Sequence, residues 1–209
     1  DNISIKKVNQ SWIAPADDQR PAMMIGAGRK WSNFDGANDE IDFAFDGGAG
    51  PSDCSIFARF KTLDSIGILI ADPDSGGRYI LTWHGASTDV NLHNGAGTPE
   101  IYINGILFSG HRTDLANALK AGEWLTVEIR NADLSTWPNA SLSGYSGYNM
   151  DADIAGLVIV ETSDLTMLNR KLIEDWLIER TLTLLDKDIL ALATVSLLAP
   201  NLEGMTIAR

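Results

Sequence analysis

The segment Glu100-Ile101-Tyr102-Ile103-Asn104-Gly105-Ile106-Leu107-Phe108 decides the fold class of this 209-residue chain. Apolar residues lie on both sides of the pair Asn104-Gly105, which supplies the two positive φ angles that a tight type I′ turn requires. The segment therefore predicts a β-hairpin.

Short strand patterns recur on both sides of this hairpin. Residues 40–45 alternate acidic and apolar side chains, which is the period-two pattern of a half-buried strand. Residues 154–160 are apolar throughout, so this strand should lie in the middle of a sheet. Further strands are expected at 54–60, 66–70, 78–83, 90–93 and 124–129. Gly, Asn and Asp turns separate them without long helices, which indicates an all-β, antiparallel sandwich rather than a parallel α/β sheet.

Helical patterns are few. Residues 114–121 form a short candidate, with Asp114 as its cap and Gly122 as its stop. A second helix is expected to begin after an Asp164 cap and to run to about Leu185. Its apolar stripe follows Leu165, Leu168, Leu172 and Trp176 and is widened by Ile173 and Leu177. We therefore divide the chain into an N-terminal arm (1–30), a sandwich with a terminal helix (31–185) and a C-terminal docking tail (186–209).

Composition excludes several classes of function. The net charge is −12 and the isoelectric point is about 4.5, so a phosphate backbone or an anionic membrane surface would repel the protein. The longest apolar run, 189–199, is about half of the ~20 residues that a membrane span needs. The single cysteine, Cys54, allows no internal disulfide and is interpreted as a small buried hydrophobe, which fits a reducing cytoplasm.

Two binding hypotheses arise from the loops. Asp72 and Asp74 flank a proline in a Gly-rich turn, and hard oxygen ligands on loops suit Ca²⁺, although aspartate is also common in turns because it caps the backbone. Trp137, Tyr145 and Tyr148 lie in loops and could form an aromatic platform for a carbohydrate. Trp83, Trp124 and Trp176 are instead expected in the core. No His pair or Cys/His cluster predicts a zinc site.

Three stretches, taken in order, resemble the laminin-G-like or concanavalin-like jelly-roll domains of bacteria and phages. They are Asn33 to Ile41 (NFDGANDEI), the Tyr102-Ile103-Asn104-Gly105 hairpin followed by a Trp124 strand, and Gly156 to Val160 leading through Leu165 into the terminal helix. The chain departs from the family pattern in the helical stretch between the hairpin and the Trp strand, and in its long tail.

The resemblance implies a jelly-roll sandwich and, by analogy, a virion structural protein made in the host cytoplasm, either a capsid decoration or a tail-associated protein. Its expected partners are other virion proteins, further copies of itself and, as a possible addition, a host-surface glycan. The tail would supply the contact with a neighbouring subunit through Ile189, Leu192, Leu197 and Leu198.

A catalytic alternative rests on Glu40 and Asp42, which resemble the start of the acidic strand of concanavalin-like glycoside hydrolases. That chemistry needs a second carboxylate on the same face, at position 44 or 45. The chain has Ala44 and Phe45 there, so we expect no catalysis. A carbohydrate-binding module is the main alternative function, and a hydrolase the lesser one.

Overall fold

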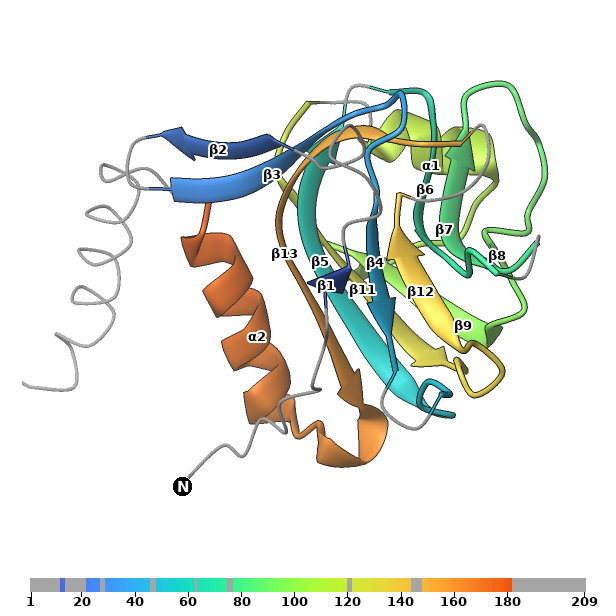
Figure 1. Ribbon diagram of the computed structural model, residues 1–209. Coiled ribbons are helices and arrows are strands. Elements are labelled where there is room, and N and C mark those ends of the chain that lie inside the picture. The colour runs from blue at the N-terminus through green and yellow to red at the C-terminus, as the bar shows by residue number, and fades with distance from the viewer. Residues whose placement is uncertain are drawn as a thin grey trace, which may run out of the picture.

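A computed structural model describes residues 12–13, 22–26, 29–45, 48–62, 64–74, 77–119, 122–143 and 148–181 (Figure 1). The described strands form two antiparallel sheets. The six-stranded sheet has the order β1 (Trp12–Ile13), β4 (Ile41–Ala44), β12 (Asn139–Leu142), β6 (Ile66–Ala71), β7 (Tyr79–His84) and β8 (His93–Asn94). The seven-stranded sheet has the order β10 (Ile106–Leu107), β9 (Gly97–Ile103), β11 (Leu125–Ala132), β5 (Cys54–Thr62), β13 (Asp151–Glu161), β3 (Arg29–Asp35) and β2 (Ala22–Gly26). The expected all-β class is confirmed.

Two local predictions are also confirmed. Ile103 pairs with Ile106 across a two-residue turn in which Asn104 and Gly105 have φ angles of 50° and 79°. Strand β13 lies between β5 and β3, inside the seven-stranded sheet. Segments of the expected arm also enter the sheets, since β1 pairs with β4 and β2 pairs with β3.

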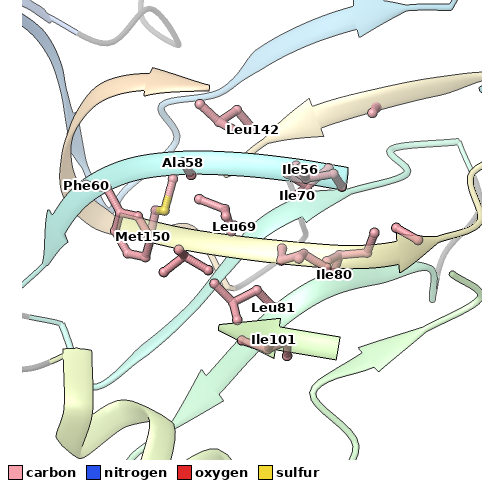
Figure 2. Close-up of a cluster of buried hydrophobic side chains, with 14 of the residues drawn as sticks. Ile56, Ala58, Phe60, Leu69, Ile70, Ile80, Leu81, Ile101, Leu142 and Met150 are labelled. Atoms are coloured by element: carbon pink, nitrogen blue, oxygen red, sulfur yellow. The ribbon is translucent and has the colours of Figure 1, made fainter. Parts of the chain in front are cut away.

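The hydrophobic core lies between the two sheets. Figure 2 shows Ile56, Ala58 and Phe60 of the seven-stranded sheet close to side chains of the six-stranded one. The Phe60 ring stacks on Trp83 with centroids 6.1 Å apart, and both residues are fully buried. Gly67, on the neighbouring strand, leaves room for this indole, because a Cβ there would lie 2.3 Å from Cζ2 of Trp83.

The two α-helices in the described part of the chain begin at other residues than expected. Helix α1 (Arg112–Leu119) starts before Asp114, whose carboxylate accepts a hydrogen bond from the backbone N–H of His111 in the first turn. Helix α2 (Met167–Glu179) is capped by Thr166, whose hydroxyl accepts from the N–H of Asn169. Asp164 belongs instead to a short 3₁₀ turn. Both differences arise because several polar residues near each start can serve as caps.

Cys54 provides a first testable prediction. The thiol is fully buried, its Sγ lies 3.4 Å from the carbonyl oxygen of Ala132, and burial raises its pKa to about 12. Because the thiolate is the reactive species, the folded protein should not react with a thiol reagent over hours at pH 8. The same reagent should label Cys54 fully in denaturant. Rapid labelling of the folded protein would contradict the buried position.

Candidate functional site

Trp137, expected on the surface, is completely buried. Its indole N–H donates a 2.7 Å hydrogen bond to the carbonyl of Gly95, and its backbone bonds to Leu134 and Gly50. The loop before β12 therefore turns its largest side chain into the core. The prediction that Trp137 stacks on a sugar is wrong, because no face of the ring meets solvent.

The other residues of the expected aromatic platform do not restore it. Tyr148 is partly exposed, and Tyr145 lies outside the described residues. A stacking platform for a sugar needs an exposed aromatic face. With Trp137 withdrawn, the described residues give no specific support to a carbohydrate site here.

Asp72 and Asp74 are engaged by the protein itself. The Asp72 carboxylate is fully buried, lies 3.2 Å from Nη1 of Arg78 and accepts a hydrogen bond from the N–H of Asp74. Asp74 accepts from the amide of Asn139. Within the described ranges, no three His, Cys, Asp or Glu side chains gather where they could hold a metal ion. We therefore assign both aspartates to the turn, where Asp72 caps the backbone and Asp74 links the turn to Asn139.

The carboxylates of Glu40 and Asp42 lie close enough to interact. Burial raises the pKa of Glu40 above its usual value, and the negative charge of Asp42 adds to the increase. Asp42 faces Ser141 across the β4–β12 pair. Of the two positions where a hydrolase would need its second acid, 44 holds the half-buried Ala44, and 45 holds Phe45, which is buried and packs edge-on against Phe43. The missing partner is thus replaced by a core residue.

A surface hollow of about 320 Å³ lies where the edges of the two sheets meet. Strand β8 is the last strand of the six-stranded sheet and β10 is the end strand of the seven-stranded sheet, and residues of both line the hollow. Most of its lining is apolar: Val90, Leu92, Pro99, Ile101, Leu107 and Phe108. The hollow therefore forms only in the folded protein, where two segments without any recognisable motif come together.

The polar side chains that line the hollow are His93, Glu100 and Ser109. His93 is half-buried, and burial lowers its pKa below the usual value, so the ring is neutral at pH 7. The Glu100 carboxylate accepts a 3.0 Å hydrogen bond from the hydroxyl of Tyr102, whose ring also carries the Arg130 guanidinium 3.8 Å from its centroid. The hollow therefore exposes polar and apolar surface in about equal measure.

Exposed apolar side chains surround this hollow. Val90 is 63% exposed and Leu107 is 54% exposed. Ile106, next to Leu107 on the hairpin, is the most exposed of the three, at 73%. A group of exposed apolar side chains is typical of a contact with another molecule. The sequence contained one signal for it, the apolar pair Ile106-Leu107 directly after a tight turn.

The tail residues expected to contact a neighbour, Ile189, Leu192, Leu197 and Leu198, lie outside the described residues. No helix in the described part of the chain has the length and apolar character to cross a membrane. A comparison with models of protein families gives no match, and a comparison with curated protein sequences gives none either.

Proposed function

We propose that this protein is a non-enzymatic structural component that works by assembling with copies of itself and with other proteins. The observation that carries the proposal is the group of exposed apolar side chains at the two sheet edges: Val90 and Leu107, which line the hollow, and Ile106, which neighbours Leu107 in β10. Such a surface costs solubility in an isolated protein, and burial in a contact removes that cost.

The contact we propose is two-fold symmetric. In an isologous contact the same surface faces itself, so a projecting side chain and the hollow that receives it must lie side by side on one subunit. Both lie at the β10 edge: Leu107 lines the hollow, and its neighbour Ile106 points to the other face of the same edge strand. Each copy would place its Ile106 in the partner's hollow, and Val90 and Leu107 would be covered on both copies.

The setting we propose is a virion, where the protein would be a capsid decoration or a tail-associated protein with a concanavalin-like jelly-roll topology. Support comes from the resemblance of the three motifs to phage laminin-G-like domains and from the two antiparallel sheets. The acidic net charge of −12 suits a protein that must stay soluble at high local concentration.

The replacement Ile106→Asp should abolish self-association. It puts a charge where the contact buries an apolar side chain worth about 1.5–3 kcal/mol, so the dissociation constant should rise at least about tenfold. The measurement is the solution mass by light scattering over a range of concentrations. Asn117→Asp, on the exposed face of α1, adds the same charge and should leave the mass unchanged. A wild-type protein that is monomeric at every concentration would overturn the two-fold contact.

Self-association should also weaken in acid. His93 is neutral because burial lowers its pKa, and desolvation by a second copy would lower that pKa further. The associated state therefore binds fewer protons than the separate copies. The contact should be at full strength above about pH 6.5, the ordinary pKa of histidine, and should weaken as the pH falls through the lowered pKa. In His93→Gln this pH dependence should disappear. A wild-type dissociation constant that does not change between pH 7.5 and 5 would contradict the role given to His93.

A further inference from the structure

Helix α2 carries a second exposed apolar surface, distinct from the hollow. Leu168, Leu172 and Trp176 follow one another at intervals of four residues and so share one face of the helix. They are 68%, 43% and 46% exposed, and Met167 beside them is exposed as well. This is the stripe that the sequence led us to expect in the core, and the expectation that Trp176 is buried is wrong.

The opposite face of α2 is fixed on the outer side of the seven-stranded sheet (Figure 1). Leu177 is the one fully buried residue among the described positions of α2, and it fits over Gly156, where an added Cβ would lie 2.7 Å from the leucine Cδ2. The absence of a side chain at Gly156 thus lets the helix approach the sheet. The apolar contact of Leu177 with Gly156 is small, so other interactions must set the orientation of the helix.

Charged residues supply those interactions. Arg170 forms an ion pair with the buried Glu128, which also accepts a 2.8 Å hydrogen bond from Arg130. At the other end of α2, Nε of Arg180 donates a 2.6 Å hydrogen bond to the carbonyl of Ala155. These contacts fix the rotation of α2, so that Leu168 and Leu172 face away from the sheet. Trp176 lies at the margin of the contact: a Cβ at Gly156 would lie 3.4 Å from its Cζ3, and the Arg180 guanidinium lies 4.7 Å from its ring centroid.

We propose that residues 186–209 of the same chain fold back over this stripe and cover it. The chain leaves α2 at Thr181, and the apolar run begins at Ile189, so residues 182–188 form the connection. Connections of this length commonly join antiparallel helices. As a helix, residues 189–199 would extend about 16 Å, and the stripe from Leu168 to Trp176 extends about 12 Å at 1.5 Å per residue. The apolar lengths therefore match.

Attachment within one chain is favoured over attachment to a neighbour. A seven-residue connection keeps the tail at a high effective concentration beside its own α2. The tail of a second copy reaches the same local concentration only when the protein itself is concentrated. This assigns Ile189, Leu192, Leu197 and Leu198 to an intramolecular contact, where the sequence had suggested a subunit contact. The inference is independent of the contact proposed at the hollow.

Hydrogen exchange of the full chain tests this inference. We expect the amides of residues 189–198 to exchange about ten- to a hundredfold more slowly than an unstructured segment, since burial of one leucine stabilises a docked state by about that factor. The double variant Leu168→Asp, Leu172→Asp should remove this protection. The matched control, Asn117→Asp with Ala118→Asp, adds the same charges to exposed positions of α1 and should retain it. Slow exchange in strands β5 and β13 reports in each case that the sandwich is folded.

A second full-chain variant guards against local unfolding of α2. Leu192→Asp with Leu197→Asp leaves α2 intact and should raise the fluorescence of a hydrophobic dye by exposing the stripe. The proposal would be overturned if the amides of the wild-type tail exchanged as fast as those of an unstructured segment. It would also be overturned if their exchange stayed slow in the double variant Leu168→Asp, Leu172→Asp. Protection that disappears on dilution would also overturn it, because it would show a tail that docks on another copy. Ile106→Asp should change none of these results, which separates this contact from the proposed assembly.

Discussion

Replacing Trp137 with alanine should lower the free energy of unfolding by about 3–5 kcal/mol, the usual cost of removing a large aromatic side chain from a core. The indole is completely buried, so the substitution leaves a cavity. It also removes the donor of the hydrogen bond to the Gly95 carbonyl, which then lacks that partner.

Denaturant unfolding followed by far-ultraviolet circular dichroism measures this loss. The control is Ile106→Ala, which removes a mostly exposed side chain and should change the stability by less than about 0.5 kcal/mol in the dilute protein. A loss below about 1 kcal/mol for Trp137→Ala would mean that the indole is not in the core. The aromatic platform for a carbohydrate would then deserve renewed consideration.

Gly67→Ala should destabilise the protein by about 2–3 kcal/mol, a typical cost of overpacking. The new methyl group would lie 2.3 Å from Cζ2 of Trp83. The indole has little freedom to move away, because it stacks on Phe60 on one side and its N–H donates a 3.2 Å hydrogen bond to the carbonyl of Asp64. The strain must therefore spread into the backbones of β6 and β7.

Thermal or denaturant unfolding measures this effect, and the near-ultraviolet circular dichroism of the tryptophans reports on the packing directly. Gly85→Ala is the matched control, because its methyl group would lie 3.1 Å from the Cβ of Ser65 in an exposed turn. Equal stability of Gly67→Ala and Gly85→Ala would contradict the tight packing of Trp83 against β6.

The parts of the fold that sequence reasoning predicted are those governed by neighbours in the chain. Asn104-Gly105 fixes a tight turn by its backbone preferences alone, and the structure has this turn. The apolar run 154–160 indicated a strand with neighbours on both sides, and β13 has them. In both cases the signal is contained in fewer than ten consecutive residues.

The tryptophans show where such reasoning fails. Trp137 precedes a proline in a loop and was expected on the surface, yet its loop is held inward by hydrogen bonds to distant segments, including Gly50 and Gly95. Trp176 belongs to a helical stripe that was expected in the core. The face of α2 that meets the sheet is instead set by the fit of Leu177 over Gly156 and by the ion pair of Arg170. Periodicity gives a helix its apolar stripe but does not say which molecule or segment covers it.

The candidate site could not be predicted from the sequence for a similar reason. The hollow combines residues 90–93 with residues 99–110, and it exists only because the edges of both sheets end at the same side of the molecule. Neither segment has a motif with chemical meaning.

The central claim is that copies of this protein associate through the hollow and Ile106. The most direct test compares hydrogen exchange of the wild-type chain at high and low concentration. We predict that, at high concentration, exchange becomes slower at residues 90–93 and 106–110 and stays unchanged elsewhere. Identical exchange at both concentrations, or slowing confined to other segments, would contradict the claim.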